Sequence, residues 1–367
     1  MNRLKFGILM KKVGILNFQY STHNYGAVLQ AAALENICRQ LGHEAQHLDY
    51  MAKPKANLRS FIGKLLRKLG IRKAPQANQV ANEEAFERFR QNFIKRTQRI
   101  KSAKEFPTAA KGFDSVIVGS DQVWRPAFAK DMLAFFLGYV PKGVDRIAYA
   151  ASFGTAAWEQ ADDTVLTEAV RQELQQFRAI SCREESGVQI CRDVFGVGAE
   201  HVLDPLLLVD EPFFEKVVAP SSIQPAAKLV YYKLDSSPEF QEDLKVVGKE
   251  IDSDAVNIYL KDSSVREYRE VPDWVALIRN SEVVVTDSFH CICLALRFGK
   301  EVIFCPNEKR GQTRLDSLFN MLNVSAEPLT VELKTPMFKL VRRGDIAGTL
   351  ESLRSHSMKF LVDALND

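Results

Sequence analysis

The sequence predicts an α/β protein with two doubly wound domains that face a shared cleft. Three observations predict it. Strand patterns alternate with helical patterns along most of the chain. The length of 367 residues exceeds the about 250 to 300 residues at which a single hydrophobic core stops growing. Finally, residues 116–121 and 283–288 are both apolar strands that end in a small, polar and acidic turn, so each half is expected to carry a ligand loop at the carboxyl edge of its sheet.

The first half of the chain indicates six strands with intervening helices. It opens with a strand over 12–18, a polar loop over 19–23, a helix over 24–41 ended by Gly42, and a strand over 45–50. This spacing predicts a right-handed unit with parallel strands. Further strands are expected at 115–118, 146–152, 179–183 and 201–203, and helices at 83–97, 162–178 and 186–194.

The second half repeats the alternation after an irregular connector. Residues 204–225 contain four prolines and are expected to lack regular structure. The expected strands are 229–234, 255–259, 282–286 and 301–305, and the expected helices are 238–251, 273–280, 288–298 and 346–365. The predicted organisation is an N-terminal domain over 10–210 with a helical insertion at 51–100, a C-terminal domain over 211–345, and a C-terminal helix over 346–367.

The insertion contains an unusual basic segment. Residues 51–82 hold eight lysines and arginines and no acidic residue. Within them, apolar side chains over 58–69 follow helical spacing and leave the basic side chains on the other face. Such a helix can lie on an anionic membrane surface, or it can pack on the domain with solvated lysines. Both interpretations stay open.

Composition excludes several classes of protein. The 49 basic and 46 acidic residues give a net charge of +3, which is too balanced to indicate a nucleic-acid partner. No stretch reaches the roughly 18 to 20 apolar residues that span a bilayer, and the apolar run at 6–10 is too short for a signal peptide, so we expect a cytoplasmic protein. The six cysteines form no CxxC pair and lie in apolar runs, which favours buried thiols over disulfides or zinc.

Familiar catalytic signatures are missing. The sequence has no phosphate-binding G-x-x-x-x-G-K-[ST] and no G-x-S-x-G nucleophile turn. Its Gly196-Val-Gly198 lacks a third glycine and precedes a strand instead of following one, so it does not fit a dinucleotide site. These absences disfavour ATPases, dehydrogenases and α/β hydrolases.

One candidate for chemistry lies where a strand over 282–286 meets a helix. The first-turn amides there favour an anion, and Asp287 or Ser288 can cap the helix. The imidazole of His290 can exchange protons near neutral pH. The alternative is that Asp287 is an N-cap alone and His290 a satisfied interface residue.

Other candidates lie at the same kind of corner. Arg183 can reach into the cleft, or it can pair with the glutamates that follow it. Arg310 and Arg314 lie on a glycine-containing loop that suits a multiply charged small anion, and a solvated loop explains them equally well. The glycine of Asn24-Tyr25-Gly26 permits close approach by a ligand, or it packs the helix on a strand.

Six short segments occur in a characteristic order. They are Asn-Tyr-Gly-Ala-Val-Leu-Gln at 24–30, Val-Gly-Ser-Asp-Gln-Val-Trp at 118–124, Ala-Ala-Ser-Phe-Gly at 150–154, Ser-Cys-Arg-Glu-Glu-Ser-Gly at 181–187, Leu-Asp-Pro at 203–205 and Val-Val-Thr-Asp-Ser-Phe-His at 284–290. Together they resemble the polysaccharide pyruvyl transferase family over about residues 11–323. The resemblance implies two Rossmann-like domains facing a cleft, as in glycosyltransferase-B folds. It also implies transfer of a pyruvyl group from phosphoenolpyruvate to two sugar hydroxyls, giving a ketal on an exopolysaccharide or cell-surface glycan.

The resemblance and the chemistry suggest a role for each candidate. His290 is expected to transfer the proton, and Asp287 to orient His290 or the acceptor. The C-terminal domain would hold the donor, phosphoenolpyruvate, with no metal and no further cofactor. Its expected ligands are Arg183, Ser288, Arg310 and Arg314. The N-terminal domain would bind the saccharide acceptor through Asn24, Tyr25, Asp121 and Gln122.

Two positions depart from the family pattern and keep other functions open. Some members carry an arginine where this chain has Ser288, and a glycine often stands where it has Cys291. A glycosyltransferase that uses a nucleotide sugar is one alternative, and a saccharide-binding member without catalysis is another. If the acceptor is lipid-linked, the segment 58–69 is expected to hold the protein peripherally at the inner membrane face.

Overall fold

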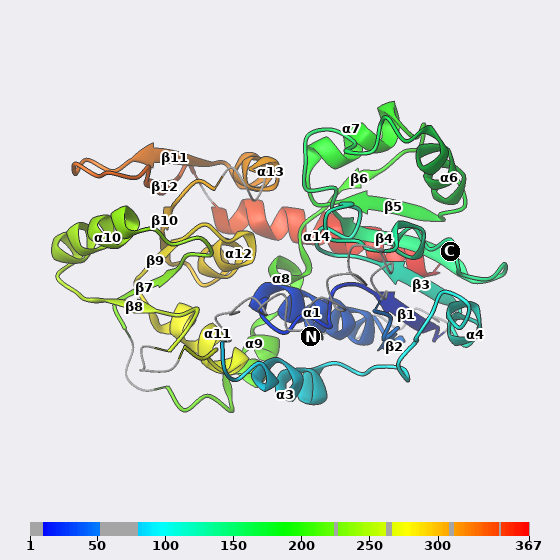
Figure 1. Ribbon diagram of the computed structural model, residues 1–367, viewed down its shortest axis with the longest axis horizontal. Helices are drawn as coiled ribbons and strands as arrows, with labels where there is room; N and C mark the ends of the chain where they lie inside the picture. The colour runs from blue at the N-terminus through cyan, green and yellow to red at the C-terminus, as the bar shows by residue number, and fades with distance from the viewer. Residues whose placement is uncertain are drawn as a thin grey trace, which may run out of the picture.

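The computed structural model describes residues 10–51, 80–223, 227–261, 266–307, 312–344 and 346–366. Two six-stranded sheets, one in each half of the chain, lie side by side (Figure 1). This is the two-sheet α/β architecture that the alternation predicts. The segment 58–69 lies outside the described residues, so its contact with a membrane stays a prediction. Among the described residues, no helix is long and apolar enough to cross a bilayer.

The first sheet is entirely parallel, in the order β2-β1-β3-β4-β5-β6. Its strands are β1 (Lys12–Leu16), β2 (Glu44–His47), β3 (Ser115–Val118), β4 (Asp145–Ala151), β5 (Ala179–Cys182) and β6 (Glu200–His201). Alternate side chains enter different cores: Ile117 packs on one face of the sheet, and Val116 and Val118 pack on the other. Because helices cover both faces, the central strands β1 and β3 read as apolar runs, as the sequence indicated.

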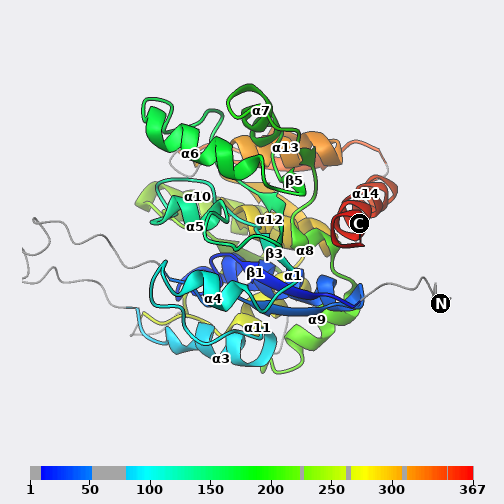
Figure 2. The same ribbon diagram turned by 90° about the vertical axis from the view of Figure 1, so that its right-hand side faces the viewer.

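The four helices expected in this half are present, and two short helices at 106–110 and 132–135 were not predicted. They are α1 (Tyr25–Gln40), α3 (Glu84–Phe93), α4 (Phe106–Ala110), α5 (Met132–Phe135), α6 (Thr164–Leu174) and α7 (Glu185–Asp193). Side-chain caps explain several starts: Asn24 accepts from Ala27 N, and Asp163 accepts from Leu166 N. The short helices α4 and α5 lie at the opposite side of this half from the chain's carboxyl end (Figure 2).

The second sheet has the order β11-β12-β10-β9-β7-β8. Its strands are β7 (Leu229–Tyr232), β8 (Ala255–Asn257), β9 (Val283–Thr286), β10 (Glu301–Phe304), β11 (Val324–Pro328) and β12 (Phe338–Arg342). The first four are parallel and were predicted. The antiparallel pair β11 and β12 was not predicted, because most of its side chains are exposed or half-buried and give no apolar run. The helices are α10 (Pro238–Ile251), α11 (Val271–Asn280), α12 (Phe289–Arg297) and α13 (Thr313–Leu322).

The connector between the sheets contradicts its prediction. The four prolines suggested irregular structure, yet α8 (Pro205–Leu208) and α9 (Glu211–Val218) form there. Pro205 and Pro212 stand in the first turn of each helix, where the missing N–H costs no hydrogen bond. Helix α8 packs against both α1 and α12, so the connector is part of the junction between the two halves.

The last helix, α14 (Ile346–Asn366), returns to the first sheet (Figure 1). The Phe360 ring lies 6.2 Å from that of Tyr149 on β4, and Ser357 Oγ accepts a 3.0 Å hydrogen bond from Leu203 N. One apolar core runs from the first sheet through Trp274 into the second. The six cysteines are free and buried, as predicted. The expected domain boundaries at 210 and 345 stay predictions.

Candidate functional site

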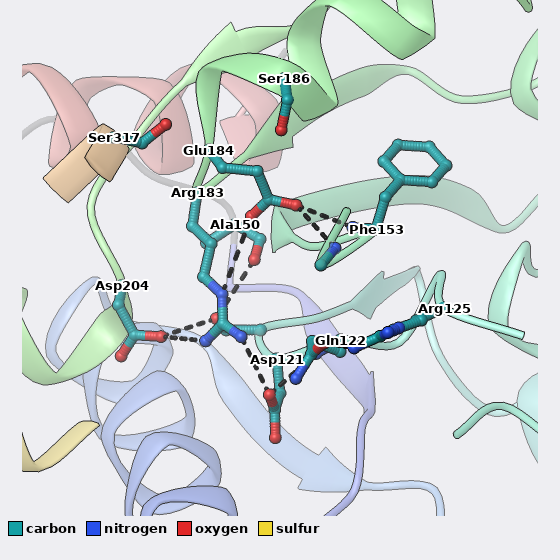
Figure 3. Close-up of polar contacts among 12 residues, drawn as sticks. Asp121, Gln122, Arg125, Ala150, Phe153, Arg183, Glu184, Ser186, Asp204 and Ser317 are labelled. Atoms are coloured by element: carbon teal, nitrogen blue, oxygen red, sulfur yellow. Dashed lines mark hydrogen bonds and ion pairs between the residues drawn. The ribbon is translucent and has the colours of Figure 1, made fainter. Parts of the chain in front are cut away.

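The carboxyl ends of the first-sheet strands bring several polar residues together. Asp121 follows β3, Arg183 follows β5, and Asp204 follows β6 (Figure 3). Parallel strands end at one edge of a sheet, which is where ligands of doubly wound folds bind. Residues that are far apart in the sequence therefore meet in one buried group.

Arg183 is at the centre of this group. Its Nη2 donates to Asp121 Oδ1 at 2.9 Å, and its Nη1 donates to Asp204 Oδ2 at 3.0 Å (Figure 3). The same Nη1 lies 3.2 Å from His290 Nε2, which comes from the second sheet. Burial alone lowers the pKa of Arg183, but the charges of Asp121 and Asp204 outweigh burial and raise it. Arg183 thus links both halves, and its predicted binding of a donor stays a prediction.

The two carboxylates are held in the charged form. Burial raises the pKa of Asp204, but the hydrogen bond and charge of His290 and the charge of Arg183 outweigh burial and hold that pKa well below its usual value. The pKa of Asp121 is lowered in the same way, mainly by Arg183. Ser120 Oγ lies 2.9 Å from Asp204 Oδ2, so a hydroxyl also supports the carboxylate. We call Asp121, Arg183, Asp204 and His290 the Arg183 cluster.

Glu184 fixes the strand-to-helix corner that carries Arg183. Its Oε1 accepts hydrogen bonds from Phe153 N at 2.8 Å and from Gly154 N at 3.1 Å (Figure 3). Gly154 has φ of +71°, and a Cβ there would lie 2.1 Å from Gln122 Oε1. The segment 150–154 therefore serves the site through its backbone.

His290 can approach Arg183 because helix α1 leaves room for the imidazole at Gly26. A Cβ added to Gly26 would lie 2.2 Å from His290 Nδ1, which is an impossible contact. The sequence left open whether Gly26 admits a ligand or packs a helix on a strand. In the structure, Gly26 accommodates the imidazole from the second half of the chain.

Asp287 does not face His290 as expected, although Ser288 takes the N-cap position that the sequence allowed. Asp287 accepts from Lys233 Nζ at 2.9 Å, Asn307 Nδ2 at 2.8 Å and Leu234 N at 3.0 Å, all within the second half. The carboxylate that faces His290 is Asp204, whose Oδ2 is 3.6 Å from Nε2. The expectation that Asp287 orients His290 is thus corrected, whereas orientation of the acceptor by Asp287 stays a prediction. Ser288 occupies the N-cap position of α12 but makes no side-chain cap bond.

A second arginine approaches the cluster from α13. Arg183 Cζ lies 4.5 Å and Arg314 Cζ 5.6 Å from the centroid of the Phe289 ring. Burial, and then the charge of Arg183, lower the pKa of Arg314 to about 10. The charge of Arg125 acts in the same direction, so Arg125 also lies near Arg314. Arg310 lies outside the described residues, and its role stays a prediction.

The expected acceptor residues separate. Tyr25 is fully buried, and its hydroxyl lies 3.1 Å from the carbonyl oxygens of both Tyr259 and Arg269. Its ring stacks on Trp274 at 5.0 Å. Tyr25 is therefore a contact between the two halves, and its expected place against the acceptor is wrong because no face of it is open.

Of the remaining acceptor candidates, Asn24 and Gln122 are half-buried and Asp121 is buried. The Asn24 side chain caps α1 through Ala27 N at 3.2 Å. Gln122 is half-buried, and its Oε1 accepts from Arg125 Nη1 at 3.1 Å. Asp121 belongs to the Arg183 cluster. Binding of the acceptor by these three residues stays a prediction.

The sequence analysis did not select Asp204, Glu184 or Arg125 as site residues. A signal was present for two of them: Asp204 follows a predicted strand directly, and Glu184 adjoins Arg183. Arg125 directly follows the segment 118–124 and has no signal of its own. Within the described ranges, no group of three histidine, cysteine, aspartate or glutamate side chains is arranged to hold a metal ion.

Comparison with known proteins identifies the family. The model of the polysaccharide pyruvyl transferase family matches residues 24–309, which is more than half of the chain. The chain belongs to the polysaccharide pyruvyl transferase family. All six segments of the site lie within the matched range. A sequence search among curated proteins finds no match.

A solved structure supports the fold. A putative UDP-N-acetylglucosamine 2-epimerase from Listeria monocytogenes has a TM-score of 0.50 at 11% identity, over 98% of this chain and 92% of that chain. The UDP-GlcNAc 2-epimerase from Neisseria meningitidis has a TM-score of 0.43 at 11% identity, over 98% and 94%. At such identity the likeness concerns the fold alone. The protein has the glycosyltransferase-B type of two-sheet α/β fold, as the sequence predicted.

Proposed function

We propose that this member of the polysaccharide pyruvyl transferase family transfers the pyruvyl group of phosphoenolpyruvate to a saccharide and forms a pyruvate ketal. The observation that supports the proposal is that all six family segments contribute to one buried site. Their contributions are Gly26, Asp121, Gly154, Arg183, Asp204 and His290. Residues that meet only through the fold are expected to share a task.

The reaction needs one proton delivered and two removed. A sugar hydroxyl adds to C2 of phosphoenolpyruvate while C3 takes up a proton and becomes a methyl group. A second hydroxyl of the same sugar then displaces phosphate at C2. Of the two hydroxyl protons, one balances the proton gained by C3 and the other leaves with phosphate. The protein must therefore supply a group that both gives and takes protons.

His290 is suited to that role by its two neighbours. Towards Arg183, Nε2 of a neutral imidazole accepts a hydrogen bond, because a guanidinium only donates. Towards Asp204, a protonated imidazole gains an ion pair across 3.6 Å. The Arg183 cluster thus holds Nε2 of His290 between a guanidinium and a carboxylate, with Arg183 and Asp204 as positioning residues.

Charge for the donor comes from the second half of the chain and the facing arginines. Arg183 and Arg314 flank one ring, Phe289, although their like charges repel in a buried setting. An anion beside this ring relieves that repulsion. The first-turn amides of α12, next to Ser288, add hydrogen-bond donors and the favourable end of the helix dipole. We place the phosphate and carboxylate of the donor here.

Thermal unfolding combined with a transfer assay tests the proposal. Phosphoenolpyruvate is expected to raise the unfolding midpoint, because a ligand of the native state at 100 times its Kd stabilises by about 2.7 kcal/mol. With methyl glycosides of common hexoses as acceptors, phosphate release is expected. His290→Gln should keep the phosphoenolpyruvate shift and slow phosphate release by about 100-fold or more.

The control variant is His356→Gln. It alters a half-exposed histidine of α14 that pairs with Glu200 of β6. It should leave both readouts unchanged. A midpoint raised by UDP and not by phosphoenolpyruvate would contradict the proposal and favour glycosyl transfer. A full rate of phosphate release in His290→Gln would remove His290 from the chemistry.

A further inference from the structure

A cavity of about 540 Å³ lies in the first half of the chain. It is lined by residues that include Tyr50, Lys101, Ala103, Lys130, Asp131 and Tyr139. Its size falls within the roughly 300 to 1,000 Å³ of pockets that hold small ligands. None of these residues belongs to the six family segments.

The polar centre of this cavity is a carboxylate held by two tyrosines. Tyr50 donates to Asp131 Oδ2 at 2.5 Å, and Tyr139 donates to Asp131 Oδ1 at 3.1 Å. Both rings pack edge-on against Phe106, at centroid distances of 5.3 Å and 6.0 Å. Asp131 Oδ1 also accepts from Ala134 N at 3.4 Å as the cap of α5, whereas Oδ2 accepts from Tyr50 and can accept a further hydrogen bond from a ligand.

The loop between β1 and α1 connects the cavity to the Arg183 cluster. On one side, Asn17 Nδ2 donates to Gly119 O at 3.3 Å, two residues before Asp121. On the other side, Gln19 Nε2 donates to Asp49 Oδ1 at 2.9 Å, next to Tyr50. The loop is thus bonded on one side to the segment that carries Asp121 and on the other side to the segment that carries Tyr50.

Tyr20, at the centre of this loop, packs edge-on against Phe18 at 6.1 Å, and Phe18 packs in the same way against Phe135 of α5 at 5.1 Å. Burial, and then the charge of Asp121, raise the pKa of Tyr20 to about 12. Tyr20 in turn contributes to the raised pKa of Tyr50, after burial and Asp131. The aromatic side chains of this loop thus adjoin α5, the helix that Asp131 caps.

We propose that this cavity is a subsite for one sugar ring of the acceptor saccharide; the assignment to the acceptor rests on the proposed function. Sugar hydroxyls donate well to a fixed carboxylate such as Asp131, and the C–H faces of a sugar pack on tyrosine rings. Lys101 and Lys130 at the rim supply donors for ring and hydroxyl oxygens. A nucleoside diphosphate fits less well, because Asp131 and Asp163 would repel its phosphates.

Two variants test the subsite without touching the Arg183 cluster. Ala103→Phe fills the half-buried wall of the cavity and leaves every polar group in place. Asp131→Asn keeps the volume but removes the charged acceptor. The matched control is Ala219→Phe, the same substitution at an exposed position at the end of α9. Binding is measured on the full chain by saturation-transfer NMR with methyl glycosides of glucose, galactose, mannose, N-acetylglucosamine and glucuronate.

We expect at least one glycoside to bind the unaltered chain and the control, and to bind Ala103→Phe and Asp131→Asn at least tenfold more weakly. The phosphoenolpyruvate shift in the unfolding midpoint should persist in both variants. If phosphoenolpyruvate shifts the midpoint of neither the unaltered chain nor the variants, while Ala103→Phe still weakens glycoside binding, the subsite stands and the proposed donor fails. Undiminished glycoside binding in Ala103→Phe overturns the subsite, as does the absence of glycoside binding to the unaltered chain.

Discussion

Two glycines of the site, Gly26 and Gly154, stand where a methyl group would overlap a functional side chain. At Gly26 that side chain is His290, and at Gly154 it is Gln122. Neither contact is visible in the sequence as more than a glycine near a helix or a strand. The absence of a side chain at Gly26 lets His290 reach Arg183, and its absence at Gly154 leaves room for the Gln122 amide.

Gly26→Ala is expected to displace His290 and abolish transfer. The added Cβ would lie 2.2 Å from His290 Nδ1, so the imidazole or helix α1 must move. Overpacking of this kind costs about 1 to 3 kcal/mol of stability. Urea unfolding measures that cost, and phosphate release measures the loss of activity.

The control for this prediction is Gly112→Ala, where an added Cβ meets nothing within 4 Å. It should change neither the stability nor the rate by a comparable amount. A Gly26→Ala protein with full activity would show that the closeness of His290 to α1 is not needed for the reaction.

At the scale of elements, helix α1 carries a buried acid on the face opposite to the site. Glu35 is 1% exposed, and its carboxylate accepts from Lys95 N at 3.0 Å and pairs with Arg39. Its Oε2 also lies 3.4 Å from the buried imidazole of His47 on β2. Burial raises the pKa of Glu35 to about 7, against the opposing effects of Arg39 and Lys95.

Glu35→Gln is expected to stabilise the protein more at pH 8 than at pH 4. The unfolded chain ionises Glu35 near pH 4.5, whereas the folded chain does so near pH 7, so the wild type loses stability as the pH rises between those values. A shift of that size corresponds to about 3 kcal/mol, which glutamine avoids. Urea unfolding at both pH values, with exposed Glu44→Gln as control, measures the difference. Equal effects of Glu35→Gln at pH 4 and pH 8 would contradict the raised pKa.

At the scale of the whole molecule, contacts at several places hold the two halves together. Tyr25 bonds to the backbone of the second half, helix α8 packs on α1 and α12, and α14 returns to the first sheet. The apolar core is continuous across the junction. The Arg183 cluster sits at this junction, so its geometry depends on how the halves are joined.

Removal of residues 345–367 is expected to lower the unfolding midpoint and to separate the unfolding of the two halves. Without α14, Leu203 N loses its bond to Ser357 and the Phe360 side of Tyr149 is opened to water. An unpaired buried N–H by itself costs about 1 to 3 kcal/mol. Calorimetry should show one transition for the full chain and two for the shortened chain.

The control for the shortened chain is Lys359→Ala, which alters an exposed position of the same helix. It should keep the single transition. A shortened chain that still unfolds in one transition at the original midpoint would show that α14 does not couple the halves.

Most of the fold could be predicted from the sequence because its signals are local. Apolar runs such as 115–118 and 283–286 fit buried strands, and caps such as Asn24 mark helix starts. The signal failed where the local rule allows two outcomes. Pro205 and Pro212 can break a helix or begin one, and the β11–β12 pair lies at a sheet edge, where polar side chains are tolerated.

The sequence by itself determined the two α/β sheets, the family, and the residues Arg183 and His290 around which the site is built. Only the tertiary structure decided their partners: Asp204 rather than Asp287 faces His290, Tyr25 is buried between the halves, and Gly26 receives the imidazole. The physical reason is range. Strand and helix signals act over a few residues, whereas the contact of Arg183 with His290 spans 107 positions, which strand order and the joining of the two sheets bring together.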